Sequence, residues 1–433
     1  MKTEQIIEAD LTWFEGRFEP GIQVEVAGDG TIARAGRLGM TTTSRRESQA
    51  LLPGMINAHS HAFQRALRGQ GETFAKESGS FWSWREAMYG LAADLDPDAL
   101  HTWTTRCFRE MRRAGITTVG EFHYLHHKGT SKDFALDEVV LAAARDAGIR
   151  IVLLQTHYVN GGVGIPLSAR QQRFDTIDVS KYLQQLDRLQ SMMRARETAG
   201  VVAHSIRGVP IDAMKALYVE SKKRDLVFHM HLEEQPQEIA DCVTAYHQRP
   251  LELVIEHLEP GANFTAVHCT HSIPDQLRQL FANGANVCVT PTTEANLGDG
   301  IPTIAPPHAL PAQICLGTDS NSRISMIEEM RWLEYGQRLR QQKRGVFIDA
   351  GGELGPRLFQ SATVGGARSL GVQAGTIAAG LHADFFTIDL THPSLDGYTT
   401  ESLMNAMILG TSEEVITATC VGGGWEEHRT TKG

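Results

Sequence analysis

Cysteine is scarce in this sequence, and the few cysteines present do not form metal or disulfide motifs. The 433 residues contain six cysteines, and no two of them form a Cys-x-x-Cys pair. Such usage is typical of reduced thiols in a cytosol and argues against a disulfide framework or a zinc knuckle. No stretch approaches the ~20 apolar residues of a membrane span, and Met1–Gln5 begins no apolar signal core. We therefore expect a cytoplasmic protein with no membrane partner.

Positive charge is also in the minority. The chain has 41 Lys and Arg against 51 Asp and Glu, a net charge of −10. A nucleic-acid surface needs a basic face, so nucleic acid is not an expected partner. The 42% hydrophobic and 21% charged content is that of an ordinary globular protein. The length exceeds the usual single-domain size and predicts one large domain with an appendage, or two domains.

Short apolar runs alternate with helix-like segments through the middle of the chain. The eight runs are Leu51–Ile56, Thr117–Val119, Ile149–Leu154, Val201–Val202, Leu226–Phe228, Phe264–Val267, Asn286–Val289 and Gln313–Leu316. Helical spacing of apolar residues lies between them, at Pro97–Ala114, Leu136–Ala147, Val179–Thr198, Ile211–Lys223, Gln237–Tyr246, Asp275–Asn283 and Ile327–Lys343. Eight such strand–helix units predict a parallel sheet closed into an α/β fold, the (β/α)₈ TIM-like barrel.

The two ends of the chain have a different pattern from the middle. The first fifty residues hold strand-like runs such as Ile22–Val26, followed by a turn signal at Gly28–Gly30. Strand-like runs return near the end, at Ala383–Leu390. We expect residues 1–50 and 372–433 to form one composite small β-sandwich domain. Residues 51–371 are expected to form the barrel hydrolase domain.

Histidine and aspartate recur directly after the predicted barrel strands. His59 and His61 follow the first run, and residues two apart on a strand point to the same face. Later runs end in His231, His268 and Asp319. Because the carboxyl ends of barrel strands meet at one rim, where active sites lie, we expect these side chains to converge.

Three imidazoles and a carboxylate are a suitable donor set for Zn²⁺ or Fe²⁺ with one position left for water. Any one of these histidines alone is more simply interpreted as a core residue hydrogen-bonded to the backbone. Their recurrence at several strand ends favours a metal site.

These motifs are similar to those of the amidohydrolase superfamily, in the branch that deaminates amino- and imino-carbon centres. The matching residues are Pro53-Gly54-Met55, His59-Ser60-His61, His231-x-x-Glu234, His268 and Thr318-Asp319. The resemblance spans nearly the whole chain and includes the split β domain. It implies metal ligation by His59, His61, His231 and Asp319, and catalytic roles for Glu234, His268 and Asp319.

One departure from the binuclear members of that superfamily bears on the number of metal ions. Those members carry a carbamylated Lys at the end of the fourth strand, where it bridges two metals. Here the corresponding segment is Ala203–Arg207, which contains no Lys. We therefore expect one metal ion per subunit, Zn²⁺ or Fe²⁺.

Longer segments resemble the formimidoylglutamate deiminases within this superfamily. They are His61–Ala66, Ser80–Arg85, Glu121–His127, His204–Arg207, Thr293–Gly300 and Arg331–Gly336. The resemblance implies hydrolysis of N-formimino-L-glutamate to N-formyl-L-glutamate and ammonia, a reaction of histidine degradation. It further implies that the substrate is held by Gln64, Arg85, Tyr124, His204 and Arg207.

The chemistry of a dicarboxylate substrate agrees with two arginines, because guanidinium binds carboxylate in a bidentate manner. Without the resemblance, Arg85 is interpreted as an exposed surface residue, Arg207 as part of an ion pair at the barrel rim, and Tyr124 as a packing residue. The remaining histidines of the same segment are expected to be second-shell or solvated; they are His123, His126 and His127.

Other functions stay open at this point. A related aminohydrolase could act on another formimino or guanidino acid or on a nucleobase, although the arginines favour an acidic substrate. A non-catalytic scaffold with the same fold would lack some of these residues, and none is missing here. Cys269 is interpreted as a buried thiol rather than a nucleophile. A homodimer is expected from the family likeness and from the frequency of two-fold assemblies.

Overall fold

Eight parallel strands form a barrel at the centre of the molecule. The computed structural model describes residues 5–72, 79–304 and 311–428. Each barrel strand pairs with the one before it in the order β6 (Met55–Ser60), β7 (Ile116–His123), β8 (Arg150–His157), β11 (Glu197–Ala203), β12 (Phe228–Leu232), β13 (Phe264–His268), β14 (Asn286–Val289) and β15 (Ile314–Leu316). The predicted (β/α)₈ architecture is confirmed.

Backbone hydrogen bonds bring the first and last barrel strands together at the residues of the candidate site. The Asp319 N–H donates to the His59 carbonyl at 3.0 Å, and the His61 N–H donates to the Asp319 carbonyl at 2.9 Å. Ser60 and Asp319 form a parallel bridge between them. The same contacts that nearly close the barrel therefore fix three candidate ligands relative to one another.

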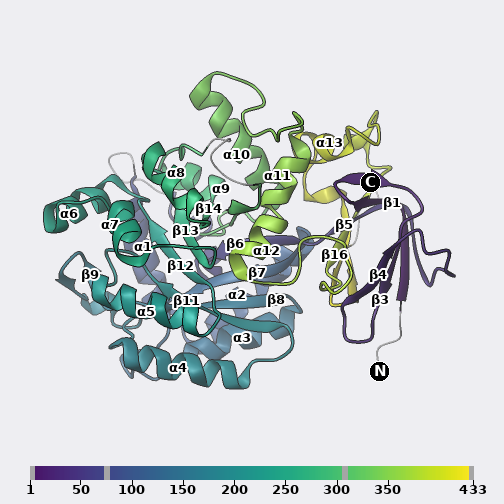
Figure 1. The fold of residues 1–433 in the computed structure, drawn as a ribbon. Coiled ribbons are helices and arrows are strands. Elements are labelled where there is room, and N and C mark those ends of the chain that lie inside the picture. Colours follow the sequence, from purple (N-terminus) through teal and green to yellow (C-terminus); the bar gives the residue numbers. More distant parts are fainter. Residues whose placement is uncertain (1–4, 73–78, 305–310, 429–433) are drawn as a thin grey trace.

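Helices cover the outside of the barrel (Figure 1). They are α1 (Phe81–Asp94), α2 (Pro97–Arg113), α3 (Ala135–Ala147), α4 (Val179–Met192), α5 (Ile211–Lys223), α6 (Pro236–Tyr246), α7 (Pro250–Leu258), α8 (Pro274–Ala282), α9 (Pro291–Leu297), α10 (Met326–Gln341), α11 (Gly355–Ser361) and α12 (Val364–Leu370). Helix α2 is an example of how the sequence forms these helices. The Asp96 side chain caps its start by accepting from the Ala99 N–H, and Pro97 occupies the first turn. Phe108 lies on its buried face. A short hairpin, β9 (Asn160–Gly162) and β10 (Ile165–Pro166), follows β8.

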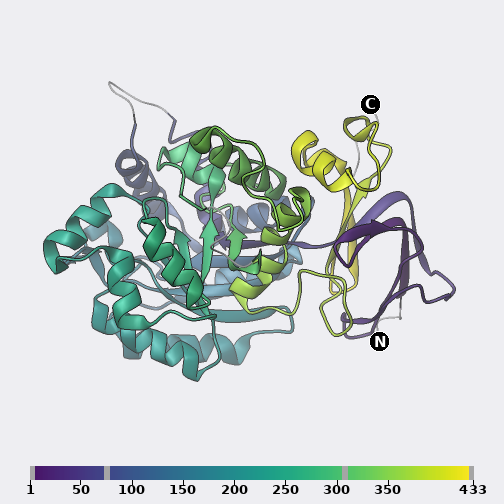
Figure 2. The same cartoon turned by 45° about the horizontal axis from the view of Figure 1, so that its top comes forward.

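Both ends of the chain build a second, mixed sheet beside the barrel (Figure 2). Its order is β18 (Gly424–Glu427), β17 (Ile416–Val421), β16 (Phe385–Asp389), β5 (Ser44–Pro53), β1 (Gln5–Phe14), β3 (Gln23–Val26) and β4 (Ile32–Gly36), with β2 (Arg17–Glu19) on β1. Ile7, Val24, Leu51 and Phe385 share one apolar cluster, so the sheet curls around its own core. Helix α13 (Leu403–Gly410) lies between β16 and β17 in the chain. The predicted small β unit from both ends is present, and the exact domain boundaries stay a prediction.

Two predicted elements differ from the structure. The run Leu51–Ile56 is divided, because β5 ends at Pro53 in the small sheet and β6 begins at Met55 in the barrel. Gly54 separates them, and a Cβ there would meet the Thr117 side chain at 2.1 Å. The helix predicted to reach Thr198 ends at Met192, although the following residues favour helix.

The early end of that helix has a physical cause in an ion pair. Arg145 on α3 donates to both carboxylate oxygens of Glu197, at 2.6 and 2.7 Å. The Glu197 carboxylate also accepts from the Arg194 N–H at 3.0 Å. These contacts hold Glu197 as the first residue of β11, so tertiary contacts override the local helix propensity.

A helix that crosses a bilayer must be both long and apolar. None of the helices in the described ranges combines sufficient length with sufficient apolar character.

Candidate active site

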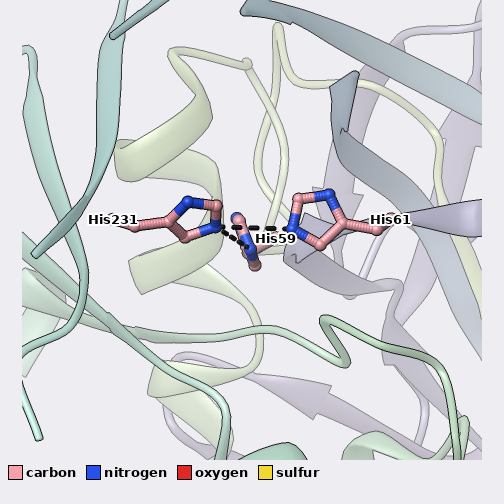
Figure 3. Close-up of side chains that lie close together, drawn as sticks. All are labelled: His59, His61 and His231. Atoms are coloured by element: carbon pink, nitrogen blue, oxygen red, sulfur yellow. Dashed lines mark hydrogen bonds between the residues drawn. The ribbon is translucent and has the colours of Figure 1, made fainter. Parts of the chain in front are cut away.

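Four side-chain donors converge at the carboxyl rim of the barrel. Figure 3 shows three of them, the imidazoles of His59, His61 and His231. The His231 Nε2 lies 3.2 Å from the His59 Nε2 and 3.4 Å from the His61 Nε2. The Asp319 Oδ1 lies 3.3 Å from the Nε2 atoms of both His59 and His61. Ligands bound tetrahedrally at about 2.0–2.1 Å from one ion stand about 3.3 Å apart. The donor spacing therefore fits a single metal ion at the common centre.

The protonation of the three imidazoles also fits a cation. Burial, followed by the neighbouring imidazole charge of His59, lowers the pKa of His61 to about 3. Burial lowers the pKa values of His59 and His231 well below their ordinary value. The His61 Nδ1–H donates to the Phe122 carbonyl at 2.8 Å, which leaves a lone pair on Nε2. Neutral rings whose donor atoms gather around a carboxylate at this spacing form a suitable site for a cation.

The backbone around the metal donors is built for close approach. A Cβ on Gly317 would lie 2.7 Å from the His59 Cβ, so only glycine lets β15 come this near to β6. The Asn321 side-chain amide donates to the carbonyls of His61, at 3.1 Å, and of Asp319, at 2.9 Å. Asp319 itself has a φ of 44°, in the left-handed region. Such strain is maintained only where surrounding contacts over-determine it.

His268 and Glu234 lie next to these donors. The His268 Nε2 is 3.9 Å from the Glu234 Oε1 and 3.9 Å from the Asp319 Oδ2. Burial lowers the pKa of His268, but the charge of Glu234, a hydrogen bond to Glu294 and the charge of Asp319 outweigh it and raise the pKa to about 10. A cation bound by the neighbouring donors would oppose this rise and leave the ring able to accept a proton. His268 also has a left-handed φ of 74°, which turns its side chain at the end of β13. Two carboxylates and an imidazole thus surround the space beside the donor set.

One pocket holds nearly all the predicted site residues. The predicted catalytic residues that line it are Glu234, His268 and Asp319, together with the predicted ligands His61 and His231. The predicted substrate-binding residues that line the same pocket are Gln64, Arg85, Tyr124, His204 and Arg207. His59 is fully buried and reaches the site through its Nε2. Residues separated by more than 250 positions therefore meet in one cavity, while their individual roles stay predictions.

The two arginines of the pocket differ in their partners. The Arg207 Nη2 donates to the Glu234 Oε2 at 2.9 Å, and its Nε lies 3.7 Å from the Glu238 Oε2. The expected ion pair at the barrel rim is therefore present in a residue that also lines the pocket. Arg85 on α1 lies over the Trp82 ring, 4.4 Å from its centroid, and forms no ion pair within the described residues.

The other substrate-binding candidates lie beside the metal donors, and the Tyr124 ring is 5.0 Å from the His61 ring, centroid to centroid. The Gln64 side-chain amide donates to the Tyr124 hydroxyl at 2.7 Å, and Tyr124 is buried. The His204 ring lies 4.4 Å from the Tyr158 ring and 4.9 Å from the His231 ring, centroid to centroid. Tyr124 therefore packs as well as lining the pocket.

Three histidines predicted as second-shell or solvated are fully inside the protein. His126 Nδ1 lies 2.8 Å and His123 Nε2 3.1 Å from the Asp137 Oδ1. His127 is equally buried, so solvation is wrong for all three. His123 ends β7 and His126 and His127 follow it, and the ring nitrogens of all three have polar partners. Cys269 is buried and burial raises its pKa, which supports its interpretation as an inert thiol.

The sequence analysis missed the apolar lining of the pocket. It consists largely of aromatic residues: Phe81, Trp84, Met88, Tyr89, Tyr158 and Phe174. Tyr158 directly follows β8, so the rule that pointed to the other strand ends also applies to it. The residues of α1 carry no such signal, because a helix outside the strand ends reaches the pocket only through the tertiary fold.

Comparison with known proteins agrees with the fold and with the site. The amidohydrolase family matches residues 50–425, and the chain belongs to this family. The chain is 35% identical over 412 residues to the formimidoylglutamate deiminase of Pseudomonas aeruginosa, which covers 93% of this chain and 90% of that protein. The resemblance inferred from the motifs is thereby confirmed.

Solved structures show the same architecture. An amidohydrolase from Brucella melitensis has a TM-score of 0.88 and 28% identity, covering 98% of this chain and 96% of that one. An adenosine deaminase from Xanthomonas campestris with bound zinc has a TM-score of 0.80 and 20% identity, covering 98% and 93%. The second likeness concerns the fold alone.

Proposed function

We propose that this chain is a metal-dependent deiminase that hydrolyses N-formimino-L-glutamate to N-formyl-L-glutamate and ammonia. One observation carries the proposal: a single pocket contains both the converging metal donors and two guanidinium groups. The substrate has an amidine carbon to be attacked and two carboxylates to be bound, and guanidinium is the side-chain group best shaped for carboxylate. The likeness to the curated deiminase over most of both chains supports this substrate.

We propose one Zn²⁺ per subunit, held by His59, His61, His231 and Asp319. The nitrogen and oxygen donors and their spacing support zinc, although ferrous iron uses the same donor types. A single ion is supported by the absence of Lys from Ala203–Arg207. Metal analysis of the purified protein, with Zn²⁺ and Fe²⁺ compared in reconstitution, tests both points.

The reaction adds water across the formimino carbon and expels ammonia. A divalent cation, when bound, makes a water acidic enough to act as a nucleophile near neutral pH. Asp319 and His268 accept the proton of the attacking water and orient it toward the substrate carbon. Glu234 delivers protons to the departing nitrogen while the carbon–nitrogen bond breaks. Water contributes the new carbonyl oxygen, and the nitrogen leaves as NH₃.

The remaining pocket residues bind the substrate. Arg85 and Arg207 bind the two carboxylates, and Gln64, Tyr124 and His204 position the chain between them. A carboxylate that binds Arg207 competes with Glu234 for the same guanidinium. Substrate binding therefore releases Glu234 from its ion pair and leaves it available for proton transfer.

Two further properties belong to the proposal. We propose a homodimer in the cytoplasm, supported by the frequency of two-fold assemblies and by six free, buried cysteines. Light scattering of the purified protein tests the dimer, and fractionation of the source cells tests the location. A monomer or a secreted protein would contradict the respective point.

A substrate panel tests the proposed reaction directly. Metal-replete enzyme is incubated with N-formimino-L-glutamate, N-formimino-L-aspartate and guanine, and ammonia release is measured for each. We expect the highest kcat/KM with formimino-glutamate. A clear preference for formimino-aspartate or another linear amidine would change the substrate, and a preference for guanine would contradict the dicarboxylate pocket.

A further inference from the structure

The two ring nitrogens of His268 face different surroundings. Its Nε2 faces the pocket, with Glu234 and Asp319 each 3.9 Å away. Its Nδ1 points to the opposite side, where the Thr290 hydroxyl lies at 3.1 Å and the Glu294 Oε1 at 3.5 Å. The ring is fully enclosed, so these neighbours decide which nitrogen carries the proton.

Glu294 lies on α9, in a place the proposed reaction does not use. Its side chain is 2% exposed. The Glu294 Oε1 accepts from the Thr290 N–H at 3.3 Å and from the Thr290 hydroxyl at 3.5 Å. An ionised carboxylate only accepts hydrogen bonds, so the hydroxyl donates to it and keeps its own lone pairs for another donor.

When Glu294 is ionised, both routes from His268 to Glu294 place an acceptor oxygen opposite Nδ1. The direct contact places a carboxylate oxygen opposite Nδ1, and the indirect one places the Thr290 oxygen lone pair there. In each case the Nδ1–H donates, and Nε2 is left with a lone pair that faces the pocket. This is the form of imidazole that accepts a proton from water.

We propose that Glu294 is the positioning residue of His268, holding the ring in the tautomer with Nδ1 protonated and Nε2 directed at the substrate water. The kinetic consequence rests on the proposed function, whereas the tautomer itself does not. Glu294 acts through His268 and Thr290 and lies behind them, away from the pocket. The orientation of an imidazole by a third group is a general device of acid–base catalysis.

A simpler structural role for Glu294 needs to be separated from this one. Its contact with the Thr290 N–H also satisfies a free backbone donor where α9 begins. A residue with only that role would affect folding stability and leave the His268 ring unchanged. The orientation of the ring is therefore the decisive readout.

Nuclear magnetic resonance of histidine nitrogens measures the tautomer without any substrate. The zinc-loaded protein is labelled with ¹⁵N-histidine, and the His268 signals are assigned by their absence from His268→Asn. We expect the parent protein to show Nδ1 protonated and Nε2 unprotonated. Glu294→Ala should mix the two tautomers, whereas Glu294→Gln, which keeps an acceptor oxygen, should retain most of the parent pattern.

Kinetics on the same variants measure the consequence. We expect Glu294→Ala to lower kcat about 10–100-fold, the usual effect of removing an outer partner, with KM and zinc content unchanged. Glu334→Gln is the matched control. Glu334 lies on α10, is as buried as Glu294, and accepts from the Phe347 N–H at 2.8 Å. Neither Glu334 nor Phe347 lines the pocket. The control should keep the parent kcat whatever its effect on Tm.

The outcomes separate the two proposals. An Nε2-protonated His268 in the parent, or an unchanged tautomer in Glu294→Ala, would overturn the positioning role regardless of substrate. A parent enzyme that shows the expected tautomer but no activity on formimino-glutamate would support the positioning role and contradict the proposed function. An unchanged kcat in Glu294→Ala would show that Glu294 does not contribute to catalysis.

Discussion

The two ends of the pocket are built in different ways. At the metal end, His59 and His231 lie in the last residues of barrel strands and Asp319 lies just after one. The His59 Nε2 is 3.2 Å from the His231 Nε2 and 3.3 Å from the Asp319 Oδ1. At the carboxylate end, Arg85 comes from a helix that follows β6, and Arg207 comes from the turn after β11. Strand ends held by sheet hydrogen bonds fix the distances that coordination needs. The turn after β11 and helix α1 position the arginines that select the substrate for this chemistry.

Metal removal should have the largest effect, because every step depends on the metal end. Dialysis against a chelator should abolish ammonia release, and added Zn²⁺ should restore it. His231→Ala should have the same effect without restoration, because a donor is missing. Activity that survives complete metal removal, verified by metal analysis, would contradict the metal end.

Glu234→Gln tests the group shared by the two ends. It should retain zinc and lose about 10²–10⁴-fold in kcat, the usual contribution of general acid–base catalysis. Measured zinc content and kcat of the variant check this together. Full turnover in this variant would show that protons reach the leaving nitrogen by another route.

Arg207→Ala should act mainly on the carboxylate end. We expect kcat/KM for formimino-glutamate to fall by a factor that corresponds to about 2–5 kcal/mol of lost transition-state stabilisation, because a desolvated carboxylate loses its charged partner. The removal also leaves Glu234 and Glu238 without their guanidinium, so Arg207→Lys is the control that keeps the charge but loses the bidentate geometry. Unchanged kinetic constants in Arg207→Ala would refute the carboxylate clamp.

Gly317→Ala tests how rigid the metal end is. The new methyl group would lie 2.7 Å from the His59 Cβ and its carbonyl oxygen, so β15 has to move away from β6. We expect zinc affinity to fall about 10–100-fold, as for other changes that misplace a ligand without removing it. Parent-like affinity, measured by competition with a chromophoric chelator, would show that this rim adapts.

A small pH effect is expected from a rim position outside both ends. Burial, followed by the charge of His126, lowers the pKa of His157 to about 4, so the folded protein holds this ring neutral. Its contribution to stability is present above the unfolded pKa of about 6.5 and is lost as the pH falls toward 4. At about 1.4 kcal/mol per pKa unit, we expect a loss of about 3 kcal/mol in the free energy of unfolding over this range. Denaturant unfolding of the parent and of His157→Gln at several pH values should show the difference, and parallel curves would contradict it.

The metal end could be predicted from the sequence far better than the carboxylate end. His59, His231 and Asp319 each follow an apolar run, and the barrel rule places all such positions at one rim. Arg85 was found only through the family likeness, because nothing in local spacing brings α1 over a strand end. The contact of Glu294 with His268 joins α9 to β13, and only tertiary structure shows it.

Element boundaries failed where tertiary contacts outweigh local preference. The residues after Met192 favour helix, yet Arg145 holds Glu197 in a strand. The run Leu51–Ile56 is uniformly apolar, so periodicity cannot show that it passes from one sheet to another at Gly54. Both errors lie at the amino ends of barrel strands, β6 and β11, away from the carboxyl ends that carry the site, which is why they did not affect the site prediction.

Anomalous diffraction from crystals of the zinc-loaded protein, recorded on both sides of the zinc absorption edge, tests the metal end most directly. We expect one strong peak per chain, equidistant within error from the Nε2 atoms of His59, His61 and His231 and from the Asp319 carboxylate. Two peaks at the rim, or a peak elsewhere with these four donors unliganded, would contradict the account.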